Sequence, residues 1–563
     1  MKYIKSLKTF LILIAGLTLL NFVGNFVFHR FDLTVDKRYT LSETTKNILE
    51  NVQEPLFIDV FLEGDFPAEF RKLQTESKQL LEEFQAHNSN VSFQFINPLS
   101  KKNEKEQLAD QLFYNGMKPV NLTVNDRGKQ SQEMVFPWAI ASKGEEHVKI
   151  QLLKNTFGAS TEDKIAVSVQ HLEYAIAEAI YKLTTEKSKK IAVIKGIGEP
   201  DDIYIADFLK TLRDSYFIAP FTLDSVAVNP QKTLKDLQSY DLAIITKPSK
   251  AFDENQIQVL DQFVMNGGAS LWMLDYVQAE MDSLQSGNGE MLTYGLDLNL
   301  GEMLFKYGVR INTDMVKDEM GSPIKLAIGR QGSETVYETF NWKYAPFAVS
   351  MSEHPIVKNM DGVRFDFANS IDTLKNDINK TVLLTSSPYA SKVGTPSVVN
   401  LVQTVNEQID PATFQQISPI PIAVLLEGAF TSVYKNRVVP FKTDAYLFDG
   451  KPTKMIVISD GDVAKNQLDQ NYEPLELGYD KWTNTMYANK EFLMNAVNYL
   501  LDENGLINLR TKEVKLPLLD KEKVYTDYDR IRTIVVGLPL MVLAIFGVLF
   551  TYLRKKKYTK QGV

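Results

Sequence analysis

Two long apolar stretches lie near the ends of the chain, and no comparable stretch lies between them. Residues 9–28 read TFLILIAGLTLLNFVGNFVF and residues 533–553 read TIVVGLPLMVLAIFGVLFTYL, and neither stretch carries a charge. About 20 residues of α-helix cross the ~30 Å hydrocarbon core of a bilayer, and a helix satisfies its own backbone polar groups there. The pattern predicts one membrane-spanning helix near each end and a large folded body between them.

The basic residues around these stretches predict their orientation. The second stretch is followed by the tail RKKKYTK, residues 554–560, and the first is preceded by Lys2, Lys5 and Lys8. Positively charged flanks stay in the cytoplasm, so both ends are expected there. The body, from about residue 29 to 532, is then expected on the periplasmic side of a bacterial inner membrane.

Composition narrows the class of protein further. The chain contains no cysteine, which excludes disulfides, a lipid-modified cysteine, cysteine-ligated zinc and a cysteine nucleophile. No small-residue cleavage site follows the first apolar stretch, so we expect an uncleaved anchor in place of a signal peptide. The formal net charge is −8, which argues against nucleic acid as a partner.

Period-two and helical patterns alternate in the first part of the body. Strand patterns occupy residues 56–62, 91–95, 120–124 and 133–141, and helical patterns follow Pro67 and span about 103–114. This order predicts a thioredoxin-like α/β domain. Because the C-x-x-C pair is missing, no redox chemistry is expected from it.

Buried-type strands separated by helices predict a second α/β unit. The strands are expected at 190–195, 217–223, 241–246 and 270–274, and the helices at 201–215 and 253–265. Such alternation is typical of a doubly wound parallel sheet. Residues 293–453 are richer in strands and loops, residues 454–459 are expected to return to the same sheet, and 489–501 form an amphipathic helix.

These patterns divide the chain into seven segments. The expected boundaries are an anchor at 1–29, the thioredoxin-like domain at 30–155, a linking helix at 156–189, an α/β domain with a strand-rich insertion at 190–510, a juxtamembrane linker at 511–532, a transmembrane helix at 533–553 and a basic tail at 554–563.

A search for catalytic or binding motifs finds little. Gly196-Ile197-Gly198 follows a strand, but Asp201 stands where a third glycine would be, so a structural turn is favoured over a phosphate cradle. No P-loop, H-E-x-x-H or G-x-S-x-G motif occurs. Asp460 and Asp462 are weak candidates for a metal site, and a cap for the next helix is the favoured alternative. We therefore expect no cofactor and no enzymatic activity.

The first apolar stretch carries a stripe of small and polar residues. Thr18, Asn21, Gly24 and Asn25 fall on one side of the expected helix. Such residues in a spanning helix usually face another helix, although Asn25 also fits simple tolerance near the membrane edge. The stripe predicts a contact with a partner helix.

Several short motifs resemble a known family. The first two are RFDLT at 30–34 and RYTLSETT at 38–45, and others are FINP at 95–98, ISDGD at 458–462 and NKEF at 489–492. With these motifs and two anchors, the chain resembles the GldG family of gliding-motility ABC transporter accessory proteins of Bacteroidetes. The motif positions that carry the resemblance most clearly are Asp32, Leu33, Thr34, Thr40, Leu41 and Ser42.

The resemblance implies partners and a fold. It implies a complex with a cytoplasmic ATPase and a permease, and a middle domain similar to class I glutamine amidotransferases, whose nucleophilic cysteine this chain lacks. The leading hypothesis is therefore a non-enzymatic accessory subunit serving gliding motility or envelope secretion. A receptor that binds a solute or glycan in a cleft between the two α/β units is the alternative, and a hydrolase using Ser or Asp residues is the weakest hypothesis.

Overall fold

The computed structural model describes most of the chain and divides it into two units. The described residues are 10, 12–18, 32, 38, 40–64, 66–100, 105–126, 129–156, 158–286, 288–350, 352–408, 418–443, 446–502, 504–512 and 525–559. One unit is Met1–Glu513 and the other is Val514–Val563. Each is described by itself.

The first unit begins with a four-stranded sheet in the order β2-β1-β5-β6. Its strands are β1 (Leu56–Val60), β2 (Val91–Phe95), β5 (Trp138–Lys143) and β6 (Glu146–Gln151). β1 is parallel to β2 and antiparallel to β5. The helices α3 (Ala68–His87) and α5 (Thr161–Thr184) pack against each other and against this sheet.

One predicted strand is wrong in its boundaries. The expected strand at 133–141 is divided by Pro137, which has no backbone N–H to give to a ladder. Its first half belongs to β4 (Lys129–Val135), which pairs only with β3 (Val120–Asp126) in a separate two-stranded sheet. Its second half is β5, and a further strand, β6, completes the main sheet.

The helix expected to link the two α/β units is part of the core. Ser160 caps the N-terminus of α5 by accepting from the Asp163 N–H, as a serine at this position usually does. Eleven of the 24 residues of α5 are buried, including Ile176 and Ile180. The helix therefore stabilises the body instead of crossing solvent between domains.

A seven-stranded sheet forms the centre of the larger part, in the order β19-β22-β23-β10-β9-β7-β8. The strands are β7 (Lys190–Lys195), β8 (Phe217–Thr222), β9 (Leu242–Thr246), β10 (Ala269–Met273), β19 (Asn379–Thr385), β22 (Pro421–Thr431) and β23 (Asp449–Ile458). From β23 to β8 all neighbours are parallel. The predicted parallel sheet and the return of residues 454–459 to it are confirmed, while β22 and β19 add an antiparallel edge.

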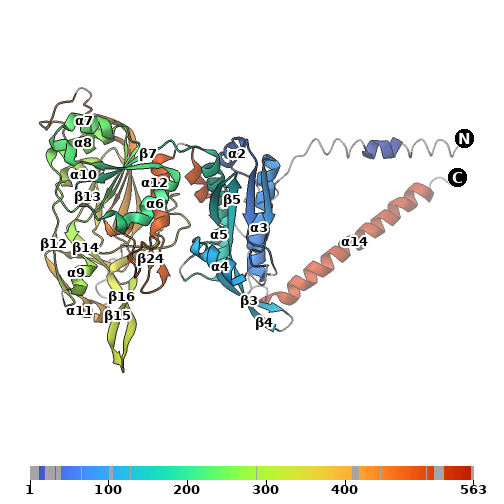
Figure 1. Cartoon of the computed structure of the whole chain (residues 1–563). Coiled ribbons are helices and arrows are strands. Elements are labelled where there is room, and N and C mark those ends of the chain that lie inside the picture. The colour runs from blue at the N-terminus through green and yellow to red at the C-terminus, as the bar shows by residue number, and fades with distance from the viewer. Residues whose placement is uncertain are drawn as a thin grey trace. The chain divides into compact units, whose positions relative to one another are not determined.

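Helices cover both faces of this sheet (Figure 1). One buried cluster joins it to α7 (Pro230–Leu237), α8 (Glu254–Met265) and α10 (Gly301–Tyr307). The other cluster joins it to α6 (Ala206–Ser215) and α12 (Asn489–Leu501). The architecture is therefore a three-layer α/β sandwich. The structure does not test the thioredoxin-like and amidotransferase-like assignments or the seven expected segment boundaries, which stay predictions.

Residues between β10 and β22 are rich in short strands and overlap the strand-rich stretch expected at 293–453, although β19, β22 and the start of β23 from that range belong to the central sheet. A long hairpin of β15 (Gly321–Gln331) and β16 (Glu334–Ala348) extends from this insertion (Figure 1, yellow). The remaining elements of the insertion are short: β11 (Val277–Gln278), α9 (Met281–Ser286), β12 (Glu290–Gly295), β13 (Val309–Ile311), β14 (Asp314–Asp318), β17 (Val363–Arg364), β18 (Ile371–Thr373), β20 (Ala390–Gly394), β21 (Ser397–Asn400) and α11 (Leu401–Asn406).

The second unit contains the helix α14 (Tyr528–Thr559). An 18-residue window within Tyr528–Lys556 has a mean hydropathy of 2.6, so the helix is long and apolar enough to cross a membrane. Most of the first apolar stretch, including Asn21, Gly24 and Asn25, lies outside the described residues. Thr18 is described, and its hydroxyl donates to the Ile14 carbonyl at 2.8 Å. The predicted first span and its contact with a partner helix stay predictions.

Candidate functional site

Three loops meet at the C-terminal ends of the parallel strands. Open α/β sheets usually bind their ligands at these ends. Lys247 directly follows β9, Asp275 follows β10, and Asp462 lies in η4 (Asp462–Ala464) after β23. Lys247 has a φ of 43°, a left-handed conformation that side chains other than glycine rarely adopt. The loop after β11 adds Glu280.

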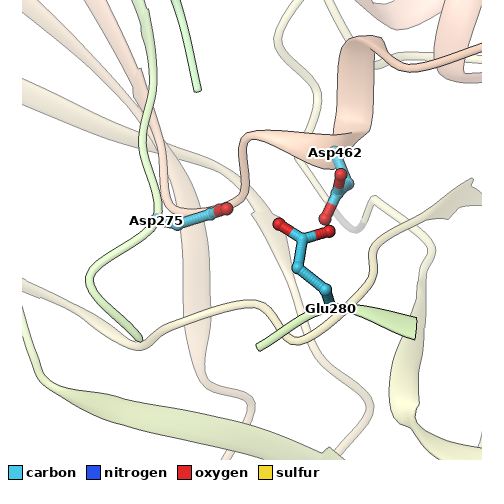
Figure 2. Close-up of side chains that lie close together, drawn as sticks. All are labelled: Asp275, Glu280 and Asp462. Atoms are coloured by element: carbon cyan, nitrogen blue, oxygen red, sulfur yellow. The ribbon is translucent and has the colours of Figure 1, made fainter. Parts of the chain in front are cut away.

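The ammonium group of Lys247 lies among three carboxylates. Its Nζ is 2.6 Å from Asp462 Oδ2, 2.8 Å from Glu280 Oε1 and 3.2 Å from Asp275 Oδ2. Figure 2 shows the three acidic side chains close together, and their nearest oxygens all lie within 4.8 Å of one another. A second cation, Lys465, is 2.7 Å from Asp462 Oδ1.

Burial and charge set the protonation of this cluster. Burial alone would lower the pKa of Lys247, but Asp462, Asp275 and Glu280 together hold that pKa well above its ordinary value. The two lysines outweigh burial at Asp462 and lower the pKa of its carboxyl group. Lys247 is therefore a charged ammonium beside the ionised carboxylate of Asp462, whereas burial raises the pKa of the Asp275 carboxyl group.

Asp460 and Asp462, the weak metal candidates, have different surroundings. Burial and three neighbouring acids raise the pKa of Asp460 well above its ordinary value. Its carboxylate accepts from the backbone N–H groups of Asp366 at 2.6 Å and Asp462 at 2.7 Å. The set whose spacing suits a cation is Asp275, Glu280 and Asp462, without Asp460. Because Lys247 sits among those three groups, the arrangement favours an internal ion-pair cluster over a metal site.

The glycine-rich turn after β7 does not offer its backbone to a ligand. The N–H groups of Gly196 and Ile197 donate to the carboxylate of Glu199 at 3.3 Å and 3.0 Å. Gly198, with a φ of 76°, packs so closely that a Cβ atom would lie 2.3 Å from Ser249 Oγ. Since an internal carboxylate takes the donors that a phosphate would need, the turn fits its structural interpretation.

A second ionic site joins residues 40–45 to Lys512, which lies at the end of the first unit, and we call it the stem clamp. The carboxylate of Glu173, on α5, accepts from the Ser42 N–H at 2.8 Å, the Thr45 hydroxyl at 2.7 Å and Lys512 Nζ at 2.5 Å. Lys512 Nζ also donates to the Thr40 carbonyl at 2.8 Å. The stem clamp thus ties the segment that enters the body from the N-terminal side to the segment that leaves it toward α14.

The clamp explains part of the motif recognised in the sequence. Ser42 caps α2 (Glu43–Glu50), Leu41 is buried, and the Thr40 hydroxyl donates to Asp32 at 3.0 Å. Leu33 and Thr34 lie outside the described residues. Burial would raise the pKa of Glu173, but Lys512 and the donors from residues 42 and 45 outweigh burial and lower it.

A third ionic site, which we call the junction lock, is centred on Glu491 and includes the buried Arg510, 19 residues further along the chain. Glu491, on α12, pairs through Oε1 with Lys154 at 2.5 Å and with Arg510 at 2.7 Å. Lys154 follows β6, and Arg510 lies in η5 (Leu506–Thr511). One carboxylate therefore connects the four-stranded part, α12 and the last residues before the second unit.

Sequence reasoning missed Lys247, Glu173 and Glu491. Each is a single charged residue whose partners lie far away along the chain, with separations of 339 residues for Glu173 and Lys512 and 337 for Lys154 and Glu491. The one available local signal was the S-x-x-T spacing of Ser42 and Thr45, which indicated a helix start without its buried acceptor.

Comparison with known proteins assigns the family. Residues 188–496 match the ABC transporter auxiliary family, described as "ABC-type uncharacterized transport system", and residues 35–142 match a domain of unknown function, DUF7088. Because the first match spans more than half of the 563 residues, the chain belongs to the ABC transporter auxiliary family. The family supports an accessory role in an ABC transport system, and the apolar helix α14 is long enough to cross a membrane.

Two more distant similarities were found. A protein of Borreliella burgdorferi is 20% identical over 536 residues, which are 94% of both chains. The solved structure of the mmIFT52 N-terminal domain aligns with a TM-score of 0.32 and 15% identity, covering 56% of this chain and 99% of that one. A likeness at that score carries no argument about the fold.

Proposed function

We propose that the protein is a non-enzymatic, membrane-anchored accessory subunit that links a periplasmic body to an ABC permease and its cytoplasmic ATPase. The same proposal includes a role in gliding motility or envelope secretion in Bacteroidetes. It also includes two spans in the inner membrane and a body made of a thioredoxin-like and an amidotransferase-like domain. Family membership supports the accessory role.

The stem clamp is the observation that carries this proposal. Glu173 holds Ser42, from the N-terminal side, and Lys512, from the side of α14, on one buried carboxylate. A body held by two helices in one bilayer needs its two stems to leave from one place. A clamp there also allows a displacement of either stem to reach α5, which packs against the four-stranded sheet.

The ionic cluster at the C-terminal ends of the parallel strands supports the proposed lack of enzymatic activity. The position where a ligand would usually bind holds the Lys247 ammonium, which lies within 3.2 Å of three carboxylates. Asp462→Asn is therefore expected to lower the stability of the body. Any activity of the complex should fall only in proportion to the amount of folded protein that is lost.

Two experiments test the proposal. Purification of the full chain in mild detergent should recover a permease and an ATPase, and a stable chain without either would contradict it. A reporter that is active only in the cytosol tests the topology. Inserted at Gly332, in the turn between β15 and β16, it should be inactive. Fused after residue 559, it should be active. Cytosolic activity at Gly332 would overturn the periplasmic placement.

The absence of cysteine allows a direct test of the convergence of the stems. Thr40→Cys with Lys512→Cys should be joined by a short bismaleimide in intact membranes, because the Lys512 ammonium contacts the Thr40 carbonyl. Thr40→Cys with Ser333→Cys, in the hairpin turn, is the matched control and should not be joined. Equal cross-linking of both pairs would contradict the clamp.

A further inference from the structure

A cavity of about 320 Å³ opens beside the junction lock, between the end of β6, α5, α12 and η5. Its wall includes Lys154, His171, Tyr174, Glu491, Asn495 and Arg510. Small-molecule sites in proteins fall in this size range and commonly lie between structural units. We propose that this junction cavity binds a small neutral polyhydroxylated molecule, of the class of mono- and disaccharides.

The charges in the wall argue against an ionic ligand. Lys154 and Arg510 share the carboxylate of Glu491. The whole lining has three basic residues and four acidic ones, so neither sign of charge dominates. At the rim, Lys490 lies 3.0 Å from Asp207 and 3.9 Å from Glu476, which also lines the cavity. An anion would meet the carboxylates of Glu178, Asp361 and Glu476, and a cation would meet the lysines. The site is therefore suited to an uncharged molecule.

His171 supplies hydrogen-bonding capacity that the described residues leave unused. Burial, with Lys154 and Arg510 nearby, holds the pKa of His171 well below its ordinary value, so the imidazole is neutral. A neutral imidazole offers one N–H donor and one nitrogen acceptor. In the part of the chain that the structure describes, the ring packs on Tyr174 at 5.2 Å between centroids, and its nitrogens make no hydrogen bond. This donor and acceptor pair matches a hydroxyl group.

Neighbouring groups extend this pattern. The Tyr174 hydroxyl stays protonated because burial raises its pKa, and from the residues that the structure describes it accepts one long contact, 3.5 Å from Asn498. Asn495, which also lines the cavity, donates to the Ile356 carbonyl at 2.9 Å through its amide nitrogen. Among the described residues, no donor to its amide oxygen is found. Alternating donors and acceptors on neutral side chains are what several adjacent hydroxyl groups require, because each hydroxyl both donates and accepts.

The inference does not depend on a permease or an ATPase, so its failure would leave the accessory role intact. The test is isothermal titration of the purified full chain with glucose, N-acetylglucosamine and cellobiose, in a detergent without a sugar headgroup. We expect saturable binding of at least one of them with a Kd below ~1 mM. Glucose 6-phosphate should bind at least about tenfold more weakly than glucose.

Variants locate the site. His171→Leu should weaken binding by about tenfold or more, because a hydroxyl loses its partner in a buried wall. His147→Leu, on the exposed face of β6, is the matched control and should bind as the unmodified chain does. If His171→Leu does not fold, Tyr174→Phe removes only the hydroxyl and should weaken binding in the same direction.

Three results would overturn the proposal. They are no saturable binding of any of the three sugars, tighter binding of glucose 6-phosphate than of glucose, and binding that is unchanged in both His171→Leu and Tyr174→Phe.

Discussion

Glu173 and Lys512 lie 339 residues apart in the sequence and form an ion pair of 2.5 Å. The side chain of Glu173 is 6% exposed and that of Lys512 is 20% exposed. The same carboxylate also holds the Ser42 N–H, so three segments depend on one buried charge. This relationship makes Glu173 the most informative residue to change.

Glu173→Gln should lower the stability of the body by about 3 kcal/mol, because it leaves the Lys512 ammonium without its buried partner. The matched control is Glu178→Gln on the same helix, which removes a more exposed pair with Lys182 and should cost about 0.5 kcal/mol or less. Urea midpoints of the two variants measure the difference. Equal midpoints would show that the clamp contributes no more than a surface ion pair.

The pH dependence of the clamp follows from the lowered pKa of Glu173. Its ordinary value is 4.5, so the stabilisation is fully present above that pH and is lost as the pH falls below it toward the folded-state value. The difference between the unmodified chain and Glu173→Gln should therefore be constant from pH 6 to 8 and shrink on acidification. A difference that grows at low pH would contradict the assignment.

At the junction lock, substitutions of Lys154 and of Glu491 should lower the stability of the body by different amounts. Lys154→Met leaves Glu491 paired with Arg510, and we expect a loss of about 1 kcal/mol. Glu491→Gln leaves both Lys154 and Arg510 buried without a carboxylate, with an expected loss of about 3–5 kcal/mol. Thermal unfolding of both variants at pH 7 gives the order, and the reverse order would refute the arrangement.

Removing Lys247 should turn the internal ion-pair cluster into a cation site. Lys247→Met leaves Asp275, Glu280 and Asp462 with oxygens within 4.8 Å of one another, which should cost about 3–5 kcal/mol in a buffer without divalent ions. Oxygen ligands of this kind suit Ca²⁺, so millimolar Ca²⁺ should raise the melting temperature of the variant.

Two controls accompany that measurement. The unmodified chain should not respond to Ca²⁺, because the ammonium already occupies the position. Lys465→Met keeps Lys247 in place and should be less destabilised. A rise in melting temperature of the same size in the unmodified chain would mean that the ion binds without displacing Lys247.

The glycine turn after β7 gives a test of close packing. Gly198→Ala should destabilise the body by about 2 kcal/mol, since the residue has a φ of 76° and the new Cβ would lie 2.3 Å from Ser249 Oγ. Gly394→Ala, where no atom lies within 4 Å of the added Cβ, is the matched control and should change stability by less than ~0.5 kcal/mol. Similar melting temperatures would contradict the packing described for the turn.

The sequence predicted the parallel sheet well because its strands are continuous apolar runs. Residues 242–246 and 269–273 are buried along their whole length, so each run is visible without knowledge of its neighbours. The strand at 133–141 was misjudged because alternation continues on both sides of Pro137, and only the missing donor divides it. The burial of α5 was missed because charged side chains are spread along its 24 residues, and one of them, Glu173, is itself buried.

The ionic sites could not be predicted in the same way. Lys247, Asp275 and Asp462 come from loops after three different strands, and only the strand order β23-β10-β9 brings them together. The local sequence pattern of each strand does not indicate the order of the strands in the sheet. The metal hypothesis therefore paired Asp460 with Asp462 from adjacency in sequence, whereas the fold pairs Asp462 with Glu280 through Lys247.

Arg510 is 2% exposed, and its guanidinium donates to the Pro355 carbonyl, 155 residues earlier, and to the carboxylate of Glu491. During synthesis the interior therefore stays unfinished until residues 506–512 have emerged from the ribosome and reached the rest of the body. Maturation of the body would then coincide with the arrival of α14 at the membrane. A polypeptide released before that moment would carry unpaired buried charge and be a ready target for quality-control proteases.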